Sequence, residues 1–272
     1  MTDFNKVREY YKNFDEKNRL QNDNSGRLEY HMTMKILNKY LPQNQILLDL
    51  GGGAGAYSFP LAEKGHKVYL SDLSEDLISQ ARTQNEEKDG AKLFSCDVAN
   101  AIDLNIYQDN QFDAVLLFGP LYHLLEKSER QLCLSEVNRV LRPGGIVFAS
   151  FIPHLSGSIA IIDRYFRHPD QVNIDNLSEV FLTGKFNNSS SKGFQEGFYP
   201  SIDEVESLFS DSGFKKETIR SIRSFAYEKE DYLYNIKDEE MFDKITELME
   251  KYSTDYSIID TCGHAIYIGY KK

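Results

Sequence analysis

The sequence predicts an α/β fold with a doubly wound, mostly parallel sheet of seven strands, whose last strand is antiparallel. Three observations predict it. Short apolar runs alternate with helical patterns through most of the chain, a glycine-rich turn directly follows the first run, and two apolar runs near the C-terminus pair as a hairpin of strands six and seven. Longer segments between the runs predict helical or irregular lid insertions.

Composition limits the function classes. The chain has 272 residues, 41% hydrophobic and 12% aromatic, which is enough for a packed core. Its 31 basic and 42 acidic residues give a net charge of −11, so nucleic acid is an unlikely partner. Three distant cysteines and six dispersed histidines predict no disulfide framework and no metal site. Without a signal peptide or an apolar run of about 18 residues, we expect a cytoplasmic protein with no membrane partner.

Residues 1–43 predict cap helices ahead of the sheet. The first 24 residues are polar, but an unattached tail would not carry the aromatic residues Phe4, Tyr10, Tyr11 and Phe14. The spacing of apolar residues predicts a further helix over 25–40 with Ser25 as its N-cap.

The stretch from Ile46 to Ser58 carries the strongest functional signal. A buried strand, Ile46–Leu50, is followed by four glycines and then a helix: Gly51, Gly52, Gly53 and Gly55. Such a turn lets a ligand approach bare backbone N–H groups. The spacing fits both the dinucleotide pattern G-x-G-x-x-G/A and the pattern D-x-G-x-G-x-G that begins at Asp49. Asp49 favours the second pattern, because a carboxylate suits a cationic ligand and repels a pyrophosphate.

The D-x-G-x-G-x-G stretch resembles the nucleotide loop of the class I S-adenosylmethionine-dependent methyltransferases, in particular those that act on small molecules. The run Leu-Arg-Pro-Gly-Gly at 141–145 before an apolar strand is also frequent in that family. The resemblance covers residues 44–151 well, and 200–221 and 263–271 moderately. It implies a Rossmann-like methyltransferase sheet and S-adenosylmethionine as the cofactor.

The resemblance also implies which residues hold the cofactor. Asp49 and the four glycines of the loop would hold the methionine part. After the strand over 67–73, Asp72 would bind both ribose hydroxyls and Leu73 would lie against the adenine. After the strand over 91–95, Asp97 and Val98 would read the adenine edge.

The strand over 112–118 leads to the place where the family presents groups to the transferable methyl. The resemblance implies that Phe118 and Gly119 contact the cofactor. They stand where enzymes that methylate planar amines carry polar acceptors, which argues against planar-amine substrates. Tyr122 and His123 are the nearest polar pair, and an imidazole can take a proton near neutral pH. A histidine that only shapes the turn fits equally well.

The sequence says less about which residues contact the methyl acceptor. Tyr11 and Tyr30 of the cap helices would line the pocket if those helices fold over the cofactor, and the alternative is that both pack onto the sheet edge. Within the core, residues 44–272, the insertions at 152–199 and 222–259 predict a substrate lid. Scattered phenylalanines in the first insertion, Phe194 among them, predict an apolar or aromatic small-molecule acceptor.

The rest of the core follows helical and strand patterns. A helix is expected over 126–141, a strand over 146–151, a capping box at Ser201 and Glu204, and strands over 214–221 and 263–270. Two other functions stay open: methylation of tRNA or protein, and cofactor binding without catalysis by a protein that meets a partner chain.

Overall fold

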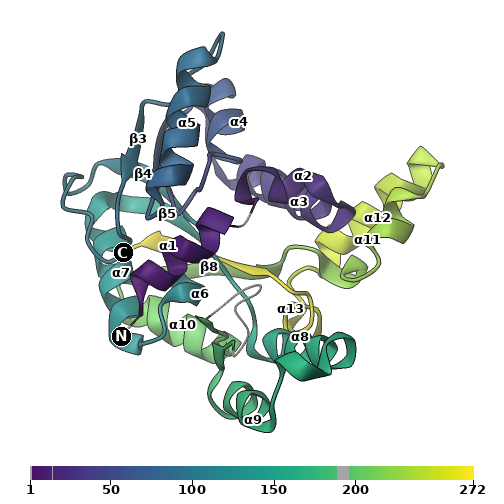
Figure 1. The fold of residues 1–272 in the computed structure, drawn as a ribbon. Coiled ribbons are helices and arrows are strands. Elements are labelled where there is room, and N and C mark those ends of the chain that lie inside the picture. The colour runs from purple at the N-terminus through teal and green to yellow at the C-terminus, as the bar shows by residue number, and fades with distance from the viewer. Residues whose placement is uncertain (1, 14, 189–195) are drawn as a thin grey trace.

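The computed structural model describes residues 2–13, 15–188 and 196–272, and a seven-stranded sheet runs through it (Figure 1). The strand order is β3-β2-β1-β4-β5-β9-β8, and β9 runs antiparallel to both of its neighbours. The strands are β1 Ile46–Leu50, β2 Lys67–Asp72, β3 Ser95–Val98, β4 Phe112–Leu117, β5 Leu141–Phe151, β8 Phe214–Ser221 and β9 Ala265–Lys271. The predicted doubly wound sheet with an antiparallel last strand is confirmed.

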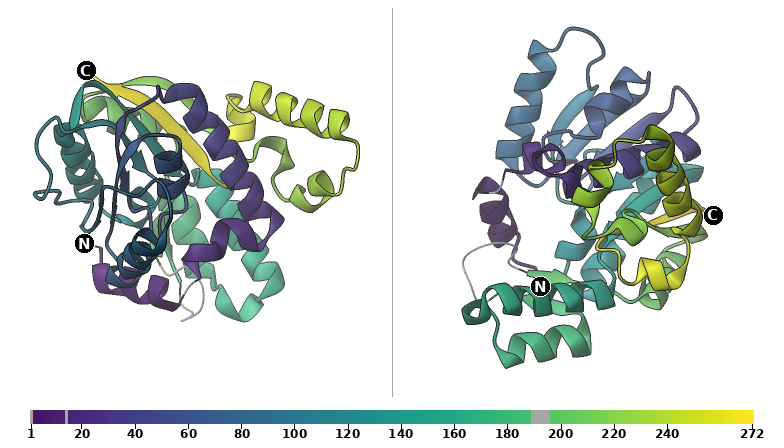
Figure 2. Two further views of the ribbon diagram at one scale, coloured as in Figure 1. Left: turned by 90° about the horizontal axis from the view of Figure 1, so that it is seen from above. Right: turned by 90° about the vertical axis from the view of Figure 1, so that its right-hand side faces the viewer.

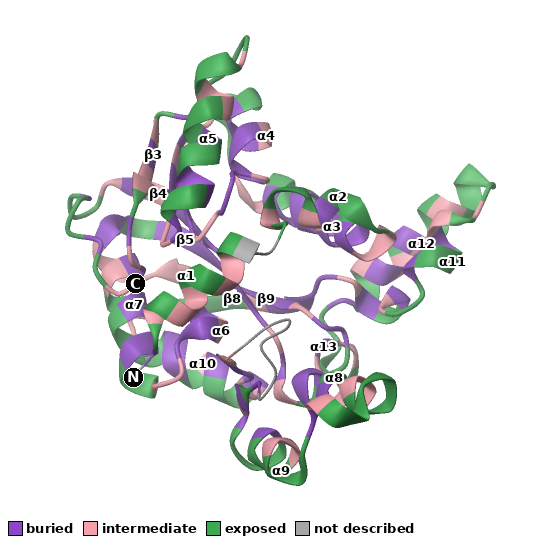
Figure 3. Cartoon of the chain, viewed as in Figure 1, coloured by how far each residue is buried: buried purple, intermediate pink, exposed green. Residues whose placement is uncertain are grey.

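Helices cover both faces of the sheet, and the strands alternate between the two cores accordingly. On β1, Leu47 packs on one face and Leu48 and Leu50 on the other. The Leu47 face is covered by α3 Asn24–Tyr40, α4 Ser58–Glu63, α5 Glu75–Glu87 and α12 Glu239–Tyr252. The Leu48 face is covered by α7 Lys127–Val140, α10 Ile202–Asp211 and α13 Tyr256–Ile259. Figure 3 shows buried strands between helices whose outer faces are exposed.

Three strands begin at other residues than predicted, and β9 is one of them, since it starts at Ala265 and not at residue 263. β3 starts at Ser95, four residues late, because its pairing with β2 begins at Tyr69 opposite Ser95. β5 starts at Leu141, directly after α7, because Leu141 already pairs with Phe112 ahead of the Pro-Gly-Gly irregularity.

The N-terminal segment forms α1 Phe4–Asn13, η1 Glu16–Asn18 and α2 Arg19–Asn22 before α3. The N-cap of α3 is Asp23, whose side chain accepts from the Gly26 N–H at 2.7 Å, so the prediction of Ser25 is wrong by two residues. Figure 1 shows α1 crossing in front of the strand ends near α6 Pro120–His123. Its start is tied down by the Thr2 backbone N–H, which donates to Glu129 Oε1 at 2.9 Å. Phe14 lies outside the described residues.

Both insertions contain helices. Between β5 and α10 lie α8 His154–Arg167, η2 Pro169–Gln171, α9 Ile174–Thr183 and the hairpin strands β6 Lys185–Asn187 and β7 Glu196–Phe198. This segment has a small core of its own around Val180 and Tyr199. Phe194 lies outside the described residues. Between β8 and β9 lie η3 Ser224–Ala226, α11 Glu230–Tyr234, α12 and α13, and Figure 2 shows α11 and α12 projecting to one side.

Candidate functional site

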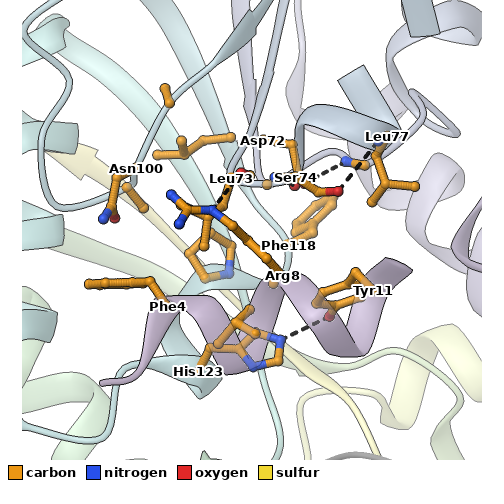
Figure 4. A pocket seen from close by; sticks show the side chains of 18 of the residues that line it. Phe4, Arg8, Tyr11, Asp72, Leu73, Ser74, Leu77, Asn100, Phe118 and His123 are labelled. Carbon is orange, nitrogen blue, oxygen red and sulfur yellow. Dashed lines mark hydrogen bonds between the residues drawn. The ribbon is translucent and has the colours of Figure 1, made fainter. Parts of the chain in front are cut away.

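A crevice lies at the carboxyl ends of β1 to β4, with α1 across its mouth (Figure 4). Its walls come from the glycine loop, the start of α5, the turns after β3 and β4, and the inner face of α1. Its lining includes Arg8, Tyr11, Gly51, Gly53, Asp72, Leu73, Asn100, Phe118, Gly119, Tyr122 and His123. Open α/β sheets bind ligands at this edge.

The glycine loop gives the crevice a wall of bare backbone. Gly51 has φ +76°, and a Cβ there would stand 2.6 Å from Pro120 Cδ, so a side chain is excluded by both strain and space. Gly53 has φ +58° and also lines the crevice. Gly52 and Gly55 do not line it, since Gly52 packs on Asp49 and Gly55 on Phe59. The loop can therefore cradle a ligand at closer range than any side chain would allow.

Asp72 fixes the second wall. Its Oδ2 accepts from the Gly53 N–H at 2.9 Å and its Oδ1 from the Ser74 N–H at 2.8 Å. Burial raises the pKa of Asp72, although these two N–H groups act in the opposite direction. Each carboxylate oxygen keeps a further lone pair, so the group can accept from a pair of ligand hydroxyls.

Asp49 lies beneath the loop and does not line the crevice. It is fully buried, and its Oδ2 accepts from Ser58 Oγ at 2.6 Å. Its Oδ1 is buried and has no hydrogen-bond partner among the described residues. Burial raises the pKa of Asp49 to about 7. An unpartnered buried carboxylate oxygen below the loop suits a cationic group bound above it, which is the chemistry inferred from the sequence.

The structure lines the third wall with residues 99–101 in place of the predicted Asp97 and Val98. Asp97 accepts from Ser95 Oγ at 2.7 Å and from the Tyr107 hydroxyl at 3.2 Å, and Val98 is 42% exposed outside the crevice. Because β3 is shifted toward the C-terminus, the chain enters the crevice only after Val98. Figure 4 shows the Asn100 side chain there, a residue that sequence reasoning missed through the misplaced strand end.

Tyr122 and His123 both line the crevice, with ring centroids 4.8 Å apart. Burial raises the pKa of Tyr122 above its usual value and lowers the pKa of His123 to about 4. His123 Nε2 lies 2.8 Å from the Tyr11 hydroxyl, which joins α6 to α1 (Figure 4). His123 therefore stays neutral at physiological pH and helps to hold the N-terminal helix.

The two predicted substrate tyrosines lie apart. Tyr11 lines the crevice, whereas Tyr30 does not. Tyr30 stacks on Tyr57 at 5.7 Å, and Tyr57 meets Phe118 edge-on at 5.4 Å. Phe118 and Gly119 line the crevice as the sequence suggested.

A chain of charged groups runs from Glu16, which lines the crevice, to His264 beside Tyr122, and sequence reasoning missed it. Arg19 Nε lies 3.0 Å from Glu16 Oε1, and Arg19 Nη1 lies 2.9 Å from Glu29 Oε1. Glu29 Oε2 lies 3.0 Å from His264 Nδ1, and the His264 ring is 6.2 Å from the ring of Tyr122. These groups come from η1, α2, α3 and the turn before β9, so no local motif could show them.

Neither a metal-binding cluster nor a membrane-spanning helix occurs among the described residues. Over residues 2–13, 15–188 and 196–272, no three or more His, Cys, Asp or Glu side chains are gathered so that they could hold a metal ion. Within the same ranges, no helix has the length and apolar character to span a bilayer.

Comparison with known proteins points to one domain type. A family model described as a methyltransferase domain matches residues 48–149. The tRNA 5-carboxymethoxyuridine methyltransferase of Escherichia coli is 31% identical over 120 residues, which are 43% of this chain and 44% of that protein. The glycine/sarcosine N-methyltransferase of Parasynechococcus marenigrum is 24% identical over 203 residues, 71% of each chain. The match thus spans less than half the length of the first relative.

The fold agrees with solved structures over nearly the whole chain. The crystal structure of magnesium protoporphyrin IX methyltransferase from Synechocystis with bound S-adenosylhomocysteine superposes with a TM-score of 0.61. The two chains share 16% identity, and the alignment covers 99% of this chain and 100% of the other. At that identity the likeness establishes the fold.

Proposed function

We propose that this chain, which belongs to the class I S-adenosylmethionine-dependent methyltransferases, transfers the methyl group of S-adenosylmethionine to a small molecule with an apolar or aromatic part. The observation that carries the proposal is the crevice itself. It joins a glycine cradle, the Asp72 carboxylate and the Tyr122 ring in one site, with Phe118 and Tyr11 as further aromatic walls.

We propose a place for each part of the cofactor, and the lining of the crevice supports it. The methionine part lies against Gly51 and Gly53, and its ammonium group is drawn to the Asp49 carboxylate below. The ribose hydroxyls donate to Asp72, and the adenine lies between Leu73 and Asn100, whose side-chain amide can hydrogen-bond the base edge. Asn100 thus takes the role that the sequence suggested for Asp97 and Val98.

Methyl transfer mainly requires that the acceptor be aligned with the methyl group. The sulfonium already activates the methyl, and holding an acceptor lone pair in line with it can supply roughly 7 to 11 kcal/mol. Tyr122, which lines the crevice, is the residue we assign to orienting the acceptor. His123, whose pKa is near 4, is a weak base, so we assign it to holding Tyr11 and the α1 cover in place.

Isotope transfer tests this proposal. The purified chain is incubated with methyl-labelled S-adenosylmethionine and a small-molecule extract of cells, and label is followed by chromatography. We expect label in one or a few small products, and calorimetry should show binding of S-adenosylhomocysteine. Binding of a nicotinamide dinucleotide instead, or absence of S-adenosylhomocysteine binding, would contradict the proposal.

Methylation of tRNA is the second candidate, because the 31% identical E. coli relative is a tRNA methyltransferase. The net charge of −11 opposes it. Labelled methyl recovered in bulk tRNA at physiological salt, with none in small molecules, would replace the first proposal by the second. Cofactor binding without any labelled product would favour the non-catalytic interaction protein.

A further inference from the structure

The molecule holds two histidines near the crevice, and their surroundings differ. His123 is buried and its Nε2 is engaged by the Tyr11 hydroxyl. His264 lies just before β9, and its Nδ1 is 3.0 Å from Glu29 Oε2. The His264 side chain remains 23% exposed, and its Nε2 has no hydrogen-bond partner among the described residues. Of the two, His264 has a ring nitrogen available to a substrate.

Glu29 determines which ring nitrogen of His264 carries the proton in the neutral ring. Its other oxygen, Oε1, accepts from Arg19 Nη1 at 2.9 Å, and its side chain is only 10% exposed. Burial alone would raise the pKa of Glu29, but His264 and Arg19 hold that pKa well below its usual range. An ionised carboxylate can only accept, so His264 Nδ1 carries a proton, and in the neutral ring Nε2 is the nitrogen that presents a lone pair.

The position of this pair suits the acceptor. Tyr122 lines the crevice and its ring lies 6.2 Å from the His264 ring, tilted by 34°. His264 is thus in ring contact with Tyr122, the residue assigned to orienting the acceptor. A partly exposed imidazole held by a buried carboxylate is what a positioned base requires.

Building on the proposed methyl transfer, we infer that His264 is the general base that deprotonates the acceptor and that Glu29 is its positioning residue. The lone pair of an acceptor oxygen or nitrogen forms the new bond to the methyl carbon. The carbon–sulfur bond breaks and its electron pair stays on sulfur, which neutralises the sulfonium. The acceptor proton passes to His264 Nε2 and then to solvent, so the acceptor must carry an ionisable O–H or N–H.

The first test reads the imidazole directly and needs no acceptor. Long-range proton–nitrogen spectra of the full chain, in mildly alkaline buffer, report which ring nitrogen is protonated, and His264→Asn assigns the signal. We expect Nδ1–H in the parent protein. In Glu29→Gln, Arg19 still binds the amide oxygen, so the amide NH₂ faces the ring and should switch it to Nε2–H. Nε2–H in the parent protein would overturn the inference.

The second test measures transfer with the acceptor found by isotope labelling. We expect His264→Ala to lower kcat by about 10²- to 10⁴-fold, with partial rescue by added imidazole, and Glu29→Gln to lower kcat without rescue. His31→Ala is the matched control, since this exposed histidine lies two positions from Glu29 on α3. A kcat for His264→Ala near that of the parent would overturn the inference.

Calorimetry separates the two proposals. S-adenosylhomocysteine should bind the parent protein and His264→Ala with similar affinity, because His264 does not line the cofactor walls. Failure of the parent to bind would refute the proposed function, whereas normal binding with unimpaired transfer by His264→Ala would refute only the role of His264.

Discussion

The two halves of the site are built in different ways. The proposed cofactor half, residues 46–101, consists of consecutive strand–turn–helix units, and its key contact joins Gly53 to Asp72 over 19 residues. The proposed acceptor half consists of α1, Arg19, Glu29, Tyr122, His123 and His264, and the Glu29–His264 contact spans 235 residues. The first half can be recognised as a motif because its spacing follows from geometry, whereas the second exists only after the whole chain has folded.

The largest effect should be the pH dependence of stability that Asp49 causes. It tests whether the proposed cofactor half holds a buried carboxylate that a bound cation would stabilise. The pKa of Asp49 is near 7 when folded and about 3.8 ordinarily, so the folded state holds the proton longer and stability falls as pH rises through that window. The loss is about 4 kcal/mol. Urea unfolding should show it in the parent but not in Asp49→Asn.

Added S-adenosylhomocysteine sharpens this test, because its ammonium group should stabilise the ionised carboxylate. The pH dependence of the parent should then shrink between pH 4 and about pH 7. An unchanged slope would mean that Asp49 only supports the loop and does not attract the cofactor.

Gly51→Ala should have the second largest effect on the free energy of unfolding. At Gly51 the backbone lies too close to Pro120 to leave room for a side chain. A left-handed φ costs a side chain about 1 to 2 kcal/mol, and the clash with Pro120 adds about 1 to 3 kcal/mol of overpacking. Gly144→Ala is the matched control, with φ +73° and no atom within 4 Å of the new Cβ. Equal free energies of unfolding for the two variants would show that the contact with Pro120 adds no destabilisation at Gly51.

Asp72→Ala should weaken S-adenosylhomocysteine binding by at least about tenfold in calorimetry. Hydrogen bonds to a charged group contribute roughly 1.5 to 3 kcal/mol each, and Asp72 would accept two from the ribose. Asp76→Ala, an exposed acid in the first turn of α5, should leave affinity unchanged. Normal binding by Asp72→Ala would refute the ribose assignment.

The same contrast explains what the sequence could predict. The strands and the glycine loop follow from apolar periodicity and glycine spacing, the role of Asp72 follows from the family resemblance, and the structure confirms the sheet. The start of β3 was misplaced because it depends on the register with β2, which a short apolar run does not encode, and the adenine readers stay a prediction. The Glu29–His264 pair could not be predicted at all, because long-range packing brings α3 beside the start of β9.

Tyr11→Phe should have the smallest effect and tests whether the acceptor half holds together independently of the cofactor half. The change removes the 2.8 Å hydrogen bond to His123 Nε2 and should lower the free energy of unfolding by about 0.5 to 1.5 kcal/mol. Tyr165→Phe, which alters a half-exposed ring on α8, is the control. Because Tyr11→Phe keeps the ring that lines the crevice and removes only the hydroxyl, affinity for S-adenosylhomocysteine should change less than in Asp72→Ala. A loss of affinity as large as that of Asp72→Ala would show that the two halves close as one unit through α1.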